Sequence, residues 1–109
     1  LFLFVGEGAE KDELVSRARA AGLPNVRFTG AVPRERVPLF YRAADVGLVP
    51  LRDVPLFSTF IPSKMFELLS AGVPIVASLR GEPAEILDRS GGAAVVPPED
   101  VTAIADPAR

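Results

Sequence analysis

Residues 61–78 read Ile61-Pro62-Ser63-Lys64-Met65-Phe66-Glu67-Leu68-Leu69-Ser70-Ala71-Gly72-Val73-Pro74-Ile75-Val76-Ala77-Ser78. This pattern predicts a loop, a helix over 63–71, a turn at Gly72 and a buried strand over 73–78. Lys64 and Glu67, three residues apart, would share one face of the first helical turns. A cation, a carboxylate and free backbone N–H groups at a helix start can hold a charged ligand that is rich in hydroxyl groups.

The rest of the chain alternates between short apolar runs and helical patterns. We expect further strands over 1–5, 26–29, 46–49 and 93–96, and further helices over 9–21, 33–44 and 82–88. Such alternation predicts an α/β fold, a Rossmann-like parallel sheet with helices on both faces. Ligands of these sheets bind beyond the carboxyl ends of the strands, which is where residues 6–8, 30–32 and 50–63 would lie.

Composition narrows the chemistry. With 109 residues, 49% of them hydrophobic, the chain can form one domain with a packed core. The net charge is −2 and no basic stripe is present, which argues against nucleic acid as a partner. Cysteine and histidine are both absent, so the commonest metal ligands and the commonest general base are missing. Carboxylates, lysine, arginine, hydroxyl groups and backbone must carry any reaction.

Two motifs have simpler alternatives. The glycines of residues 6–8 suggest a dinucleotide fingerprint, but Lys11 stands where the third glycine would be, and a tight turn after a strand is the better interpretation. Ser63 could cap the helix in front of an ordinary surface pair between Lys64 and Glu67. A capping box would need the acid three residues after the serine, and Phe66 occupies that position.

Six motifs follow one another in a defined order. They are Val5-Gly6-x-Gly8, Asn25-Val26-x-Phe28-x-Gly30-x-Val32, Tyr41-x-Ala43-Ala44-Asp45-Val46-x-Leu48-x-Pro50, Pro62-Ser63-Lys64-x-x-Glu67-x-x-x-Ala71-Gly72-x-Pro74-Ile75-Val76-Ala77-Ser78, Gly81-Glu82-x-x-Glu85-Ile86 and Val96-Pro97-Pro98-Glu99-Asp100. This order resembles the donor-binding, C-terminal domain of GT-B fold glycosyltransferases. The likeness is greatest to the retaining family-four group (glycosyl transferases group 1), which elongates bacterial glycans.

The resemblance implies roles for residues around 59–67. Glu67 matches the second Glu of the family's E-x7-E motif, which holds the ribose hydroxyls of a nucleotide sugar. The first Glu of that motif, which contacts the donor sugar, falls on Thr59 in this chain. Helix-start amides at Ser63 and Lys64 would face the diphosphate, and Lys64 would stabilise the leaving group. The other catalytic residues are unassigned.

The resemblance also implies roles for residues near the N-terminus. The backbone of Gly30, Ala31 and Val32 matches the segment that pairs with the nucleobase, and Gly6 and Gly8 would line the same cleft. No metal and no cofactor are expected, because transfer by these enzymes relies mainly on positioning and electrostatics.

The expected parent protein is a hexosyltransferase with a retaining mechanism. Residues 1–109 would be part of its C-terminal nucleotide-sugar-binding domain, with the N-terminal acceptor domain and the first strand of this domain upstream. It would move a sugar from a nucleoside-diphosphate donor, UDP being favoured over GDP, to a glycan or lipid-linked acceptor. The isolated chain should be inactive. The expected location is the cytoplasm, with peripheral association at the inner face of the membrane left open.

Two alternatives remain at this stage. A non-hydrolysing UDP-sugar epimerase shares the architecture, but such enzymes need acid and base side chains in the cleft, and the chain has no histidine. A non-catalytic nucleotide-binding α/β module of flavodoxin-like type is the second. Titration with UDP and GDP would separate these classes.

Overall fold

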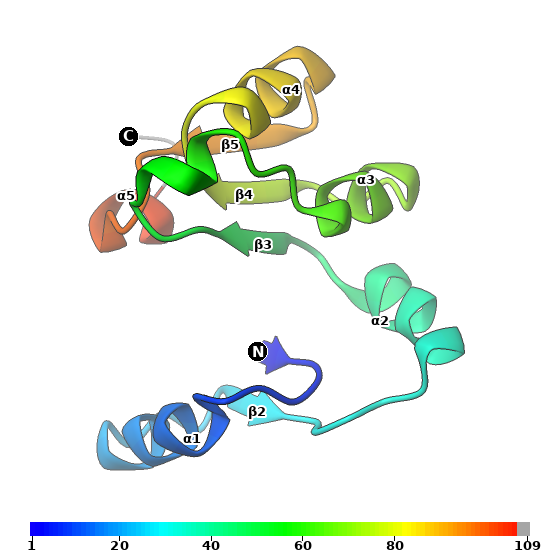
Figure 1. Ribbon diagram of the computed structural model, residues 1–109. Coiled ribbons are helices and arrows are strands. Elements are labelled where there is room, and N and C mark those ends of the chain that lie inside the picture. The colour runs from blue at the N-terminus through cyan, green and yellow to red at the C-terminus, as the bar shows by residue number, and fades with distance from the viewer. Residues whose placement is uncertain (107–109) are drawn as a thin grey trace. The chain divides into compact units, whose positions relative to one another are not determined.

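The computed structural model describes residues 1–106 and divides into two compact units, Leu1–Val37 (unit 1) and Pro38–Arg109 (unit 2). The first elements along the chain are β1 (Phe2–Phe4), α1 (Lys11–Ala20), β2 (Val26–Phe28) and the 3₁₀ helix η1 (Arg34–Arg36). They are followed by α2 (Val37–Ala43), β3 (Gly47–Pro50), the 3₁₀ helix η2 (Pro55–Ser58), α3 (Ser63–Ser70), β4 (Ile75–Ser78), α4 (Glu82–Ser90), β5 (Ala93–Val96) and α5 (Val101–Ala105) (Figure 1).

Unit 1 contains a two-stranded parallel sheet. Phe2 of β1 lies opposite Val26 of β2, and the rings of Phe4 and Phe28 stack with their centroids 4.9 Å apart. The apolar run at 1–5 is typical of a strand covered on both faces, yet Phe2 is 52% exposed. Two strands and one long helix offer too little apolar surface to cover it within this unit.

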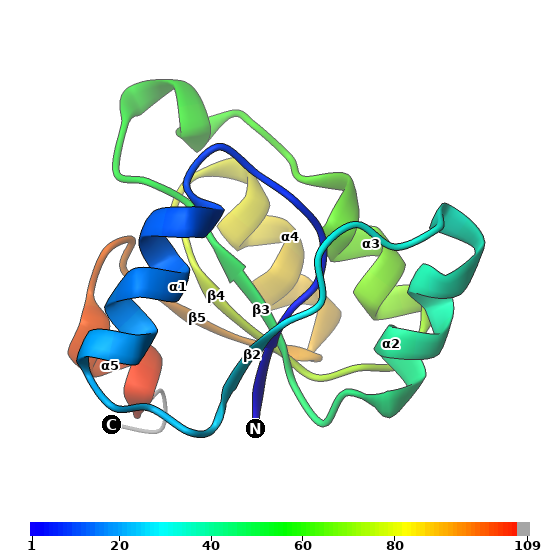
Figure 2. The ribbon, with the colours of Figure 1, turned by 90° about the horizontal axis from the view of Figure 1, so that it is seen from below.

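Unit 2 contains a three-stranded parallel sheet in the order β3-β4-β5. Gly47 of β3 pairs with Ile75 of β4, and Ile75 pairs with Ala93 of β5. Helix α3 packs on β3, α4 packs on β5 and α5 contacts β4 (Figure 2). Met65 and Leu68 of α3, Ile75 and Ala77 of β4 and Leu87 of α4 form the centre of the hydrophobic core. The start of α3 is therefore anchored on a packed sheet.

The predicted fold class is confirmed, since every strand pair is parallel and the sheets are flanked by helices. The predicted helix over 33–44 is divided into η1 and α2. Pro38 lies in the first turn of α2, where a backbone N–H would have no acceptor within the helix, so the lack of an N–H in proline costs no hydrogen bond. The predicted loop over 50–62 includes η2. Within the described residues, every helix falls short of the length and apolar character that crossing a bilayer demands.

Candidate functional site

The start of α3 lacks a side-chain cap. Pro62 occupies the N-cap position in an extended conformation, and Ser63 is the first helical residue. A proline side chain cannot accept a hydrogen bond from the first turn. The alternative in which Ser63 caps the helix is therefore wrong. The N–H of Met65 donates to the carbonyl of Pro62 at 3.1 Å, whereas the N–H groups of Ser63 and Lys64 have no acceptor among residues 1–106.

Lys64 and Glu67 do not pair with each other. The ion pairs among residues 1–106 join Lys11 to Glu7, Arg17 to Glu13 and Arg80 to Asp53. The side chain of Lys64 is exposed over much of its area, but neighbouring protein removes part of the water around its ammonium group, which lowers its pKa. The charge of Glu67 opposes this shift. A simple surface salt bridge therefore does not explain these two residues.

The Glu67 carboxylate has a partner on α2. The phenol of Tyr41 donates a hydrogen bond from Oη to Oε2 of Glu67 at 2.5 Å. Desolvation raises the pKa of Tyr41 to about 12, and the hydrogen bond to Glu67 and its charge act in the same direction. Tyr41 is therefore a protonated donor near neutral pH. The sequence pattern gave Tyr41 no role at this carboxylate, because 26 residues separate the two side chains.

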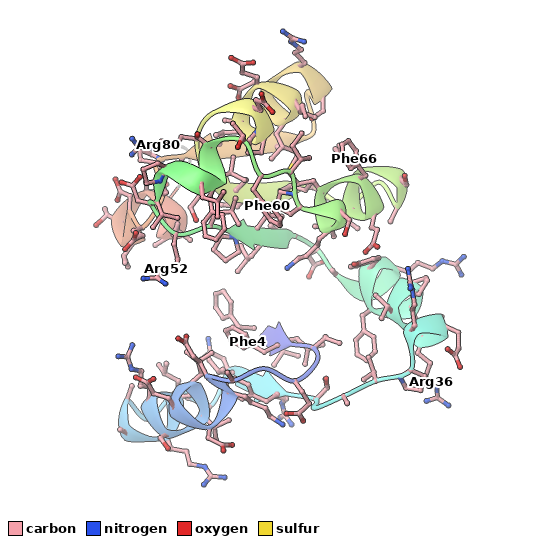
Figure 3. All side chains as sticks on the ribbon, viewed as in Figure 1. Phe4, Arg36, Arg52, Phe60, Phe66 and Arg80 are labelled. Carbon is pink, nitrogen blue, oxygen red and sulfur yellow. The ribbon has the colours of Figure 1, made fainter. Side chains whose placement is uncertain are left out.

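Thr59 lies in the loop before α3 and turns back on its own chain. Its Oγ1 donates to the carbonyl of Leu56 at 3.3 Å, and its N–H donates to the same carbonyl at 3.4 Å. The hydroxyl therefore closes the end of η2. Phe60, labelled in Figure 3, follows it along the loop and is 49% exposed. The first Glu of the E-x7-E motif would stand at this position, and the Thr59 hydroxyl does not supply the negative charge of that carboxylate.

Three contacts fix the loop that carries Thr59. The N–H of Asp53 donates to Oε2 of Glu99 at 2.7 Å, and Nη2 of Arg80 lies 3.1 Å from Oδ2 of Asp53. Figure 3 shows Arg80 at the end of unit 2 that carries η2. The backbone of Ser58 also approaches Gly81 so closely that any Cβ there would overlap the Ser58 carbonyl oxygen.

In unit 1, the structure brings two predicted site glycines together. The N–H of Gly6 donates to the carbonyl of Gly30 at 3.0 Å. Gly8 lies in the turn before α1, where its carbonyl accepts from the N–H of Lys11 at 3.2 Å. Ala31 is exposed and Val32 is half-buried just after this bridge.

Glu7 and Lys11 add charge at the same place and were not predicted as site residues. Their side chains pair at 2.7 Å, one helical turn apart in sequence. The hydrogen bond from Lys11 lowers the pKa of Glu7 most, and the Lys11 charge and the Ala31 amide add to it against a smaller effect of desolvation. Oε1 of Glu7 lies 3.0 Å from where a Cβ on Gly30 would be. Their i,i+4 spacing was the available sequence signal.

The described residues offer cations, carboxylates, a phenol and backbone N–H groups as binding groups. Among residues 1–106, no three carboxylates gather closely enough to hold a metal ion. The first turns of α3 thus supply unit 2 with a cation and a carboxylate on one face. Such a pair can bind an anion and accept hydrogen bonds from hydroxyl groups of the same ligand.

Comparison with known proteins identifies a family over the full length. Residues 1–109 match the family described as glycosyl transferases group 1. No solved structure matches the chain.

Three curated relatives agree with this match. A 2-deoxystreptamine N-acetyl-D-glucosaminyltransferase of Niallia circulans is 31% identical over 98% of the chain and 26% of the relative. A protein of Pseudomonas aeruginosa named as the glycosyltransferase WbjE is 31% identical over 95% of the chain and 26% of its own length. A protein of Bacillus subtilis (strain 168) named as the teichuronic acid biosynthesis glycosyltransferase TuaH is 36% identical over 71% of the chain and 19% of its own length. The chain thus spans between 19% and 26% of these relatives, and it belongs to the glycosyl transferases group 1 family.

Proposed function

We propose that this chain binds the donor of a glycosyltransferase, which transfers a sugar from a nucleoside diphosphate to a glycan or lipid-linked acceptor. The observation that carries the proposal is the start of α3, where Lys64 and Glu67 share one face without pairing to each other. Membership of the family and the printed names of the relatives support it.

Each charged group has a part of the donor to bind. The carboxylate of Glu67 would accept hydrogen bonds from the two ribose hydroxyls, since a carboxylate has acceptor sites for several donors. Lys64 and the first-turn N–H groups of α3 would face the diphosphate. Negative charge grows on the diphosphate as the bond to the sugar breaks, so a cation and helix-start amides at this point favour the transition state.

The remaining assignments extend the same proposal. In unit 1, the backbone of Gly30, Ala31 and Val32 would pair with the base, UDP being favoured over GDP, and Gly6 and Gly8 would line the cleft. The transfer would be of a hexosyl group, retaining and metal-independent. The remainder of the full-length protein would supply the acceptor domain and further basic residues. The 109-residue chain alone would therefore bind nucleotide weakly and turn over no donor.

The full-length protein with Glu67→Gln tests the proposal. Titration with UDP and GDP should show about a tenfold or greater loss of affinity for the preferred nucleotide, because a charge-assisted hydrogen bond contributes about 1.5–3 kcal/mol. Turnover of the matching nucleotide sugar should fall at least as much. Glu13→Gln is the matched control, because it removes the charge of an exposed helical glutamate whose partner is Arg17.

Two results would contradict the proposal. One is a wild-type full-length protein that binds neither UDP nor GDP nor any of their sugars. The other is Glu67→Gln protein whose affinity and turnover match those of the wild type. Binding without any transfer to glycan or lipid-linked acceptors would instead favour a non-catalytic nucleotide-binding module.

A further inference from the structure

Tyr41 and Glu67 connect two helices of unit 2. Helix α2 carries Tyr41 and lies beside α3 in both Figures 1 and 2. The 2.5 Å separation between Oη and Oε2 is short for a hydrogen bond between oxygen atoms, as expected when the acceptor is a carboxylate. The contact therefore restricts the Glu67 side chain more firmly than a neutral hydrogen bond would.

Both ends of this contact are anchored by packing. The ring of Tyr41 packs against the core cluster of unit 2 while its hydroxyl reaches Glu67. Met65 and Leu68, on either side of Glu67 along α3, are 0% and 2% exposed. The backbone of α3 is thus held against the sheet, and the freedom that remains at Glu67 lies in its side-chain torsions. The bond from Tyr41 acts on those torsions.

One oxygen of the carboxylate is used and the other remains available. Oε2 accepts from Tyr41, whereas Oε1 accepts no hydrogen bond from another of residues 1–106. Ser63, Lys64 and Ser70, the polar residues of α3 within about one turn of Glu67, make no hydrogen bond to it either. Tyr41 is therefore the one side chain in the described part of the protein that orients this carboxylate.

We propose that Tyr41 is a positioning residue, which holds the Glu67 carboxylate so that it is already oriented for the vicinal hydroxyls of a ribose. This inference rests on the proposed function. A flexible glutamate would lose side-chain entropy when it accepted hydrogen bonds from a diol. Because the hydrogen bond from Tyr41 already restricts the side chain in the folded protein, this loss no longer lowers the affinity for the ligand. Tyr41 would then affect the ligand only through Glu67.

The experiment compares Tyr41→Phe with wild type in the full-length protein. UDP and GDP are titrated beside their 2′-deoxy forms, which keep the diphosphate and base but lack the vicinal diol. Tyr41→Phe should weaken binding of the preferred ribonucleotide about threefold to tenfold. Binding of its 2′-deoxy form should change little. An equal loss for both forms would overturn the inference, because it would mean a general structural effect.

A double-mutant cycle gives a second readout. If Tyr41 acts through Glu67, the Tyr41→Phe/Glu67→Gln protein should bind the ribonucleotide as the Glu67→Gln protein does, and the two effects should not add. Additive losses would overturn the inference. Ser90→Ala is the matched control, because it also removes one bonded hydroxyl from a helix of unit 2, and its partners are Leu87 and Gly92. It should leave both affinities unchanged.

The inference and the proposed function fail in distinguishable ways. If Glu67→Gln lowers the affinity but Tyr41→Phe does not, the positioning role of Tyr41 is wrong and the donor site stands. If wild type fails to bind any of the four nucleotides, or if Glu67→Gln binds as wild type does, the donor site is wrong and the role of Tyr41 falls with it.

Discussion

At the scale of single residues, the absorbance of Tyr41 can be used to follow its own ionisation without interference from other chromophores. Tyr41 is the only tyrosine of the chain, and tryptophan is absent. Its phenol is partly desolvated and donates to a carboxylate, so loss of its proton would place two negative charges in contact. The ionisation of this one side chain therefore depends first on the desolvation of the phenol and then on its interaction with Glu67.

In the folded 109-residue chain, the phenolate absorbance of Tyr41 should develop at higher pH than in the denatured chain. Its pKa is raised from 10.0 to about 12. Between those values the folded state keeps a proton that the unfolded state has lost, so the stability from this group is complete below about pH 10 and is lost as the pH rises toward 12. Ultraviolet titration, with circular dichroism to monitor folding, gives both midpoints.

Glu67→Gln should move the folded midpoint of this titration downward, because it removes a charged acceptor while leaving the burial of the ring unchanged. Coincident titration curves for folded and denatured protein would contradict the prediction, as would a folded midpoint that does not respond to Glu67→Gln.

The sequence allowed some features of the candidate site to be predicted and not others. The common face of Lys64 and Glu67 could be predicted, because both lie in α3 and helical spacing is a local property. Tyr41 was missed because its contact joins two helices, and no local period encodes which helices become neighbours. A cap at Ser63 was the simpler alternative, and it is excluded because Pro62 takes the N-cap position and the helix begins without a side-chain cap.

At the scale of elements, the start of α4 governs the loop before α3. Gly81 is the N-cap of α4, with φ of 80°, and packs against the backbone of Ser58. Pro83 near the helix start and Glu82 and Glu85 in the first turn favour a helix that begins here. The position of η2 is therefore set by contact with a helix that follows it by more than twenty residues in the sequence.

Gly81→Ala should destabilise the protein by about 2–4 kcal/mol, because a positive φ and a backbone overlap must both be relieved. The matched control is Gly91→Ala at the other end of α4, where φ is 72° and no atom lies within 4 Å of the new Cβ. That change should cost only about 1 kcal/mol, since it strains φ alone. Urea denaturation of both variants measures the difference, and equal losses would contradict it.

Element boundaries were predicted where local signals are strong. The strand over 93–96 matches β5, and Gly72, with φ of 73°, follows the end of α3 as its stop signal predicts. The helix predicted over 33–44 was too long, because its first residues form η1. Residues 50–62 carry no hydrophobic period, so the short helix η2 within them could not be predicted from the pattern alone.

At the scale of the whole molecule, the buried core belongs to unit 2. Every apolar side chain that is buried among residues 1–106 comes from this unit, with Met65, Ala77 and Leu87 completely inaccessible. In unit 1, by contrast, side chains of β1 remain about half exposed. Because apolar burial is the main favourable term in folding, unit 2 should carry most of the stability of the chain.

Hydrogen exchange should resolve this difference. In the 109-residue chain, amides of β4 should exchange at least about tenfold more slowly than amides of β1, because β4 is the central strand of its sheet and its Ile75 and Ala77 belong to the buried core. Equal protection of the two strands would contradict the prediction and would show that β1 opens only when the core of unit 2 does.

One hydrogen bond of unit 2 reaches far along the chain. The N–H of Asp53 donates to the side chain of Glu99, which lies 46 residues later and has a positive φ of 61°. The segment that follows the last strand is thereby tethered to the segment that precedes Thr59. A substitution near the C-terminal end can therefore move the loop before α3 without changing any residue of that loop.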